Sequence, residues 1–159
     1  MRLARDDGSG GGRWRDTLEC LDDDAVERAC GRVSVAFANS IDRCDYDAVI
    51  ELFTRDGILD RWGTVIRGHE ALRQWLDARP RDVSTCHVCT NILVRRVAPD
   101  EARGTTYFTF YSGSNVECSD TLPLAGPVMV GEYLDRFILT ERGWRLRERV
   151  VRPRFTRRA

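Results

Sequence analysis

The periodicity of the apolar residues changes once along this chain of 159 residues, and the change falls at Pro80. Before Pro80 the apolar residues recur every three or four positions, which is typical of helices with one buried face. After Pro80 they alternate with polar residues, which is typical of strands with one buried face. A run of helices followed by a run of strands predicts an α+β fold.

Three helices are predicted before Pro80, over about 22–43, 46–57 and 68–79, with a small hairpin at 58–66 between the last two. Acidic residues at 22–24 suit the N-terminus of the first helix. Phe53 is expected on the apolar side of the second helix, which should end at Gly57. The apolar face of the first helix has a residue at every third or fourth position: Val26, Cys30, Val33, Phe37 and Ile41.

Four long strands are predicted after Pro80, over 83–98, 102–112, 128–140 and 144–151. Such a sheet must bury one face, and the three N-terminal helices are the elements that can cover it. We therefore expect a cone-shaped barrel formed by a curved, mostly antiparallel sheet, with a cavity between sheet and helices. The cone should be a single domain over 19–159, preceded by a flexible, Gly-rich and charged leader over 1–18.

The charge balance excludes several function classes. There are 25 basic and 25 acidic residues, whereas a nucleic-acid-binding protein usually carries a basic surplus. All the basic residues are Arg, so no mechanism that needs a Schiff-base lysine is possible. There is no apolar run long enough to cross a membrane and no secretory signal, so we expect a cytoplasmic protein.

The cysteines are expected to be free thiols, because nothing in the sequence indicates secretion. Cys86 and Cys89 are spaced like zinc ligands, but on a strand they would point to opposite faces. No second pair completes a metal site, and no nucleotide-binding motif is present. We therefore expect neither a metal nor a cofactor.

Several motifs in order along residues 20–153 carry a resemblance to a known family. These are SID at 40–42, DYDA at 45–48, LFTRDG at 52–57, GHEAL at 68–72, HVCTN at 87–91, GEYLD at 131–135 and GWR at 143–145. Their order and spacing resemble the nuclear transport factor 2-like superfamily, and the SnoaL-like and scytalone-dehydratase-like branch in particular.

The resemblance implies a His-Asp pair inside the cone. A His on the first long strand takes a proton, and an Asp at the end of the first helix orients it. The matching residues are His87 and Asp42, and the resemblance places Arg149 on the last strand as a third catalytic residue. The other histidine, His69, falls outside this pattern.

The residues themselves leave these roles open. Strand parity places His87 and Asn91 on one mixed face, where His87 is a proton acceptor or a structural hydrogen-bonding group. Asn91 is an amide donor to a substrate carbonyl or a structural residue. Asp42 is unfavourable at a helix C-terminus, which a bond to His87 would explain. Arg149 shares a face with Arg145 and Arg147, and this face is either solvated or part of the cavity.

Apolar side chains from three predicted strands suit the wall of a cavity for a flat or cyclic molecule. Each of them could instead belong to an ordinary core. The proposed substrate-binding wall consists of Leu59, Phe108, Phe110, Met129 and Tyr133.

Two function classes follow. The first is a cofactor-independent acid/base enzyme, a dehydratase, isomerase or cyclase, that acts on a small hydrophobic or polyketide-like carbonyl or hydroxyl compound. The alternative is a non-catalytic ligand-binding or structural subunit of the same fold, such as a dioxygenase β-type subunit. An exposed sheet face predicts a homodimer or homotrimer, with no nucleic-acid or membrane partner.

Overall fold

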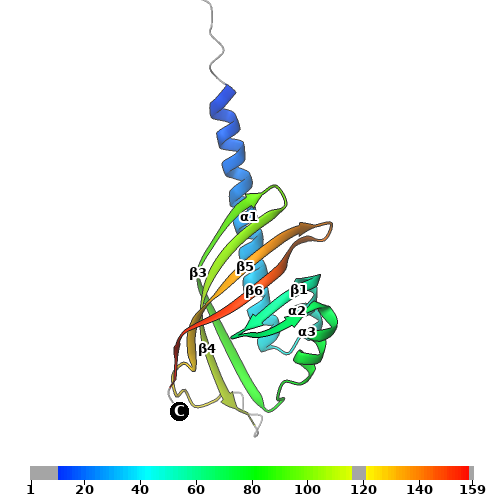
Figure 1. Ribbon diagram of the computed structural model, residues 1–159. Helices are drawn as coiled ribbons and strands as arrows, with labels where there is room; N and C mark the ends of the chain where they lie inside the picture. The colour runs from blue at the N-terminus through cyan, green and yellow to red at the C-terminus, as the bar shows by residue number, and fades with distance from the viewer. Residues whose placement is uncertain (1–10, 116–120, 158–159) are drawn as a thin grey trace, which may run out of the picture.

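The computed structural model describes residues 11–115 and 121–157, and side chains from residue 23 onward. The elements follow one another as α1, α2, β1, β2, α3, β3, β4, β5 and β6 (Figure 1). Helices therefore precede a meander of long strands, as the change of periodicity predicts. Within the described part of the chain, no helix is both long and apolar enough to span a membrane.

The helices differ from the prediction mainly at their ends. Helix α1 runs over Gly11–Asp42, so it begins well before the expected acidic cap, and no proline interrupts it. Residues 11–18 of the expected leader are therefore helical, whereas residues 1–10 lie outside the described residues. Helix α2 covers only Tyr46–Glu51, with the Asp45 side chain accepting a bond from the Ala48 amide. Helix α3 covers Gly68–Asp77.

One six-stranded open sheet forms the second layer, in the order β2-β1-β6-β5-β4-β3. Its strands are β1 Phe53–Arg61, β2 Thr64–Arg67, β3 Val83–Ala98, β4 Glu101–Ser114, β5 Met129–Thr140 and β6 Gly143–Thr156. All neighbours are antiparallel except β1 and β6, which are parallel. Phe53 begins β1, so its predicted place in the second helix is wrong. The expected curved, mostly antiparallel sheet is confirmed.

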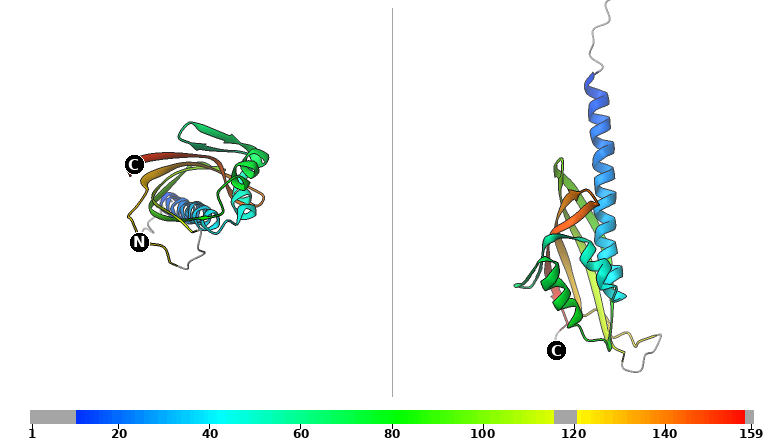
Figure 2. Two further views of the ribbon diagram at one scale, coloured as in Figure 1. Left: turned by 90° about the horizontal axis from the view of Figure 1, so that it is seen from below. Right: turned by 90° about the vertical axis from the view of Figure 1, so that its right-hand side faces the viewer.

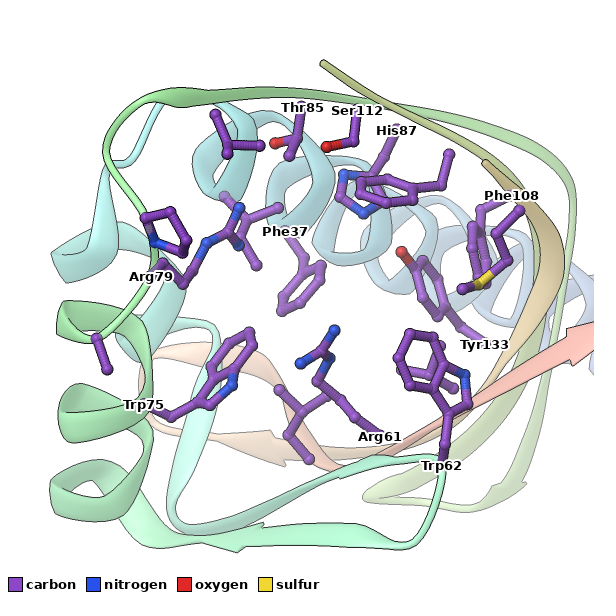
Figure 3. A pocket seen from close by; sticks show the side chains of 18 residues that line it. Phe37, Arg61, Trp62, Trp75, Arg79, Thr85, His87, Phe108, Ser112 and Tyr133 are labelled. Atoms are coloured by element: carbon purple, nitrogen blue, oxygen red, sulfur yellow. The ribbon is translucent and has the colours of Figure 1, made fainter. Parts of the chain in front are cut away.

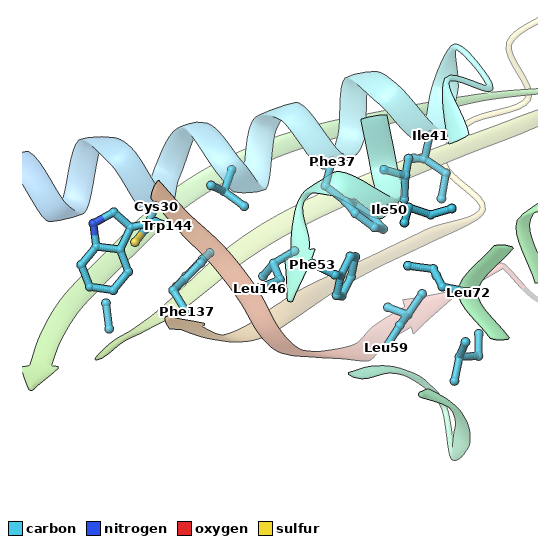
Figure 4. Packing of buried hydrophobic residues seen from close by; sticks show 14 of the residues in the cluster. Cys30, Phe37, Ile41, Ile50, Phe53, Leu59, Leu72, Phe137, Trp144 and Leu146 are labelled. Carbon is cyan, nitrogen blue, oxygen red and sulfur yellow. The ribbon is translucent and has the colours of Figure 1, made fainter. Parts of the chain in front are cut away.

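The sheet curves around the C-terminal part of α1, while α2 and α3 lie near one end of it (Figure 2). Phe37 and Ile41 of α1 pack with Phe53 of β1, Phe137 of β5 and Leu146 of β6 in the main core (Figure 4). A second, smaller cluster of Phe108, Met129 and Tyr133 adjoins it, with the ring centroids of Phe37 and Tyr133 6.1 Å apart.

Two bulges change which side chains face inward. In β3 the pairing with β4 shifts between Thr90 and Leu93, and Asn91 has a left-handed φ of 48°. In β6 the pairing with β5 shifts by one residue, so that Phe137 lies opposite Leu146 and Arg136 lies opposite Glu148. Residues on either side of a bulge no longer follow simple alternation.

Several apolar residues remain exposed on the outer side of the sheet edge, including Val88, Leu93 and Val97. Exposed apolar side chains on an edge strand suit association with another chain. The expected homodimer or homotrimer stays a prediction.

Candidate active site

A cavity of about 360 Å³ opens between the end of α1, the concave face of the sheet and the C-terminal end of α3. Most of its lining side chains are apolar or aromatic, and Figure 3 shows them arranged around a central space. Such a chamber, with a few polar groups at its edges, is typical of a site for a small molecule. It is lined by Phe37, Ile41, Leu59, Arg61, Trp62, Trp75, Ala78, Arg79, Pro80, Val83, Thr85, His87, Phe108, Phe110, Ser112, Met129, Tyr133 and Val151.

Asp42 ends α1 and reaches across to β3, where its carboxylate accepts three hydrogen bonds. Oδ1 lies 2.8 Å from Thr85 Oγ1 and 2.6 Å from His87 Nδ1, and Oδ2 lies 2.7 Å from the His87 backbone N. Burial by itself raises the pKa of Asp42, but the hydrogen bonds and charge of His87, aided by Thr85, outweigh burial and lower it. Asp42 is therefore a fixed carboxylate at neutral pH.

His87 lies in the first third of β3 with its ring at the cavity wall (Figure 3). The ring centroid is 4.6 Å from that of Phe110 and 6.3 Å from that of Phe108, so aromatic neighbours fix its plane. Because Nδ1 is bound to the Asp42 carboxylate, the neutral ring carries its proton on Nδ1. Nε2 then has a lone pair that can accept a proton from a molecule in the cavity.

Comparison of the sequence with models of known protein families assigns the chain to a family. A family model described as the SnoaL-like domain matches residues 24–150. The chain belongs to the SnoaL-like family. No curated protein matches the sequence significantly.

Solved structures agree with this assignment. The SnoaL-like protein is 30% identical to Rv3472 from Mycobacterium tuberculosis, described as a protein of unknown function, over 79% of this chain and 74% of the other, with a TM-score of 0.66. An NTF2-like protein with a cystatin-like fold from Novosphingobium aromaticivorans is 20% identical, with 91% and 90% coverage and a TM-score of 0.68. The predicted superfamily is thus confirmed.

A hexachlorocyclohexane dehydrochlorinase, LinA-type3 from Novosphingobium barchaimii, has a TM-score of 0.71 at 15% identity, over 89% of this chain and 92% of the other. At this identity the likeness shows the fold alone. The same fold therefore occurs in a dehydrochlorinase and in a protein described as of unknown function, so the fold alone does not assign an activity.

The structure brings all five residues of the predicted apolar wall to the cavity of the SnoaL-like protein. Tyr133 stacks on Phe108 with ring centroids 4.4 Å apart, and its hydroxyl group is turned toward the cavity (Figure 3). Burial raises the pKa of Tyr133, so the phenol stays protonated and can donate a hydrogen bond. The complete wall is Leu59, Phe108, Phe110, Met129 and Tyr133.

Arg149 does not line the cavity. It is fully buried behind the rings of Phe37 and Tyr133, with its Cζ 4.5 Å and 4.2 Å from their centroids. Its Nε and Nη2 donate to Asp135 at 2.8 Å and 2.6 Å, and Nη2 also donates to the Ser34 hydroxyl oxygen. The charge of Asp135 raises the pKa of Arg149 although burial opposes it.

The predicted common face of Arg145, Arg147 and Arg149 is therefore wrong. The bulge in β6 turns Arg149 inward, while Arg147 is partly exposed and pairs with Asp56 at 2.5 Å. The prediction that Asn91 contacts a substrate is also wrong, because the bulge in β3 leaves this side chain exposed and outside the cavity lining. His69, by contrast, lies outside the cavity as expected and bonds to the Phe53 carbonyl oxygen.

No sequence pattern indicates the side of the cavity that carries guanidinium and indole groups, formed by Arg61, Trp62, Trp75 and Arg79. The end of β1 and the segment after α3 meet only in the folded chain, so no local spacing could have joined them.

Metal-binding residues are not gathered around this site. Among the side chains that the structure describes, over 23–115 and 121–157, no three of His, Cys, Asp or Glu form a group that could hold a metal ion. Cys86 is exposed and Cys89 lies on the inner side of β3, so the two point to opposite faces as expected. Both are free thiols.

Proposed function

We propose that this protein is a cofactor-independent acid/base enzyme of the lyase or isomerase type. Nε2 of His87 removes a proton from a carbon of a small cyclic substrate, and Asp42 holds the ring and stabilises the imidazolium that forms. The observation that carries the proposal is the 2.6 Å bond between Asp42 Oδ1 and His87 Nδ1 at the wall of an aromatic cavity.

The electron pair released from the carbon moves into an adjacent carbonyl group, which gives an enolate. Tyr133 can donate a hydrogen bond to the enolate oxygen, because its protonated hydroxyl group faces the same cavity. In a dehydration the imidazolium returns its proton to the departing hydroxyl group, and water leaves. In an isomerisation it returns the proton to another carbon, and a cyclisation begins from the same enolate.

The proton-transfer step can be tested before the substrate is known. Deuterium incorporation from D2O into bicyclic ketones such as 2-tetralone, followed by proton NMR, measures carbon deprotonation directly. The His87→Gln variant should lower the enzyme-dependent rate about 100-fold or more, because a positioned base contributes roughly 10²–10⁴-fold. Asp42→Asn should lower it about tenfold or more.

His69→Gln is the matched control, because His69 is the other histidine of the chain and does not line the cavity. It should exchange at the wild-type rate. Exchange that survives in His87→Gln contradicts the proposal. Ketones that bind in the cavity without any enzyme-dependent exchange support the alternative of a non-catalytic ligand-binding protein.

A further inference from the structure

Two arginine side chains enter the cavity from the side away from His87. Arg61 comes from the end of β1, and Arg79 from the segment just after α3. Figure 3 shows both guanidinium groups turned toward the central space, with Trp75 between the two side chains and His87 across the cavity. Two cations in the wall of a cavity give no favourable contact to a ligand that is purely apolar.

Aromatic rings hold these guanidinium groups in place. The Arg61 Cζ lies 4.9 Å from the centroid of Trp62 and 4.8 Å from that of Trp75. The Arg79 Cζ lies 5.9 Å from Trp75 and 6.0 Å from Tyr46. Contacts with ring faces orient an arginine but leave its N–H groups free to donate at their edges.

Neither arginine has a carboxylate partner among the residues that the structure describes. Other arginines of the chain do have one: Arg73 pairs with Asp47, Arg147 with Asp56 and Arg142 with Glu51. Burial lowers the pKa of Arg61, and the like charge of Arg79 lowers it further. Two half-buried cations that repel each other are stabilised by an anion placed between them.

We propose that Arg61 and Arg79 form a carboxylate-binding subsite, and that the substrate is a cyclic or aromatic carboxylate. This inference rests on the proposed function and names the substrate class for it. A guanidinium group presents paired N–H donors that match the two oxygens of a carboxylate. The ring of the substrate then lies between the indoles and the Phe108 and Phe110 side, with its reacting carbon toward His87 Nε2.

The test compares 2-naphthoate with its neutral isostere 2-naphthamide by isothermal titration calorimetry. Wild-type protein should bind the naphthoate at least about tenfold more tightly than the amide, and added salt should weaken only the naphthoate. Arg61→Gln and Arg79→Gln should each reduce this preference, and the double variant should abolish it. The amide affinity should stay unchanged in all three, which shows that the cavity is intact.

Arg95→Gln is the matched control, because Arg95 is exposed on β3 and does not line the cavity. It should keep the full preference for the carboxylate. The proposal is overturned if the wild type binds both compounds equally, if it binds neither, or if the preference survives in the double variant.

The same titration in His87→Gln separates this inference from the proposed function. His87→Gln should retain the preference for naphthoate, because the arginines do not depend on the base. If the wild type does not exchange ketone protons but prefers naphthoate, the proton-transfer proposal is wrong and the carboxylate subsite is supported. If the wild type exchanges ketone protons through His87 but shows no preference for naphthoate, the subsite is wrong and His87 remains the base.

Discussion

His87 and His69 make their hydrogen bonds through different ring nitrogens. His87 Nδ1 faces the Asp42 carboxylate at 2.6 Å, whereas His69 Nε2 faces the Phe53 carbonyl oxygen at 3.1 Å. Both partners are acceptors, so in the neutral rings His87 must carry its proton on Nδ1 and His69 on Nε2. Only the first arrangement leaves Nε2 available as a base in the cavity.

Long-range 1H–15N NMR spectra of the neutral imidazoles should therefore show two opposite tautomers. In Asp42→Asn the His87 ring loses its charged partner and should shift toward a mixture of tautomers, while the His69 signals stay in place. Spectra of His87→Gln assign the two rings. A His87 ring that carries its proton on Nε2 in the wild type would contradict the proposed orientation of the pair.

At the scale of the element, alternation along a strand predicts a side chain's direction only up to the next bulge. His87 and Phe108 lie on uninterrupted stretches of β3 and β4, and both were correctly placed at the cavity. Asn91 lies on a bulge and Arg149 lies beyond one, so both predictions were wrong. A bulge depends on pairing with a neighbouring strand, which the sequence of one strand does not contain.

The same bulge in β6 makes Arg149 a structural residue, and this can be tested. Arg149→Met leaves Asp135 buried without its cation, which should lower the free energy of unfolding by about 3–5 kcal/mol in urea denaturation. Arg149→Met with Asp135→Leu should recover much of this loss, because a buried ion pair is often replaceable by apolar side chains.

Arg152→Met on the same strand is the control, because Arg152 is exposed. It should change the free energy of unfolding by less than about 1 kcal/mol. An Arg149→Met protein as stable as the wild type but without ketone exchange would instead restore the catalytic role that the family resemblance implied.

At the scale of the whole molecule, the fold and the cavity share part of their residues. The buried Arg149–Asp135 pair lies behind Phe37 and Tyr133 and outside the cavity, whereas Phe37, Ile41 and Leu59 belong both to the main core and to the cavity wall. The α+β class and the order of the elements follow from the periodicity of the sequence, whereas the His87–Asp42 pair was implied by the family resemblance. Neither of these indicates Arg61 and Arg79, because the closure of the cone brings their segments together.

Asp42 contributes both to the cavity and to the stability of the fold, since its carboxylate connects the end of α1 to β3. Its pKa in the folded protein lies below the ordinary value of 3.8, so protonation favours the unfolded chain. The stabilisation that Asp42 provides is therefore complete above about pH 5 and is lost as the pH falls through the lowered pKa. Asp42→Asn should be less stable than the wild type by about 2 kcal/mol at pH 5, and this difference should shrink toward pH 2.

Urea denaturation at steps between pH 5 and pH 2 measures that difference. Asp47→Asn is the matched control, because the Asp47 side chain is 88% exposed on α2 and joins no strand. Its stability should run parallel to that of the wild type through the same range. A wild-type protein that keeps a constant advantage over Asp42→Asn down to pH 2 would show that the carboxylate charge does not hold helix and sheet together. The Asp42 oxygens would then act only as neutral acceptors for Thr85 and the His87 backbone.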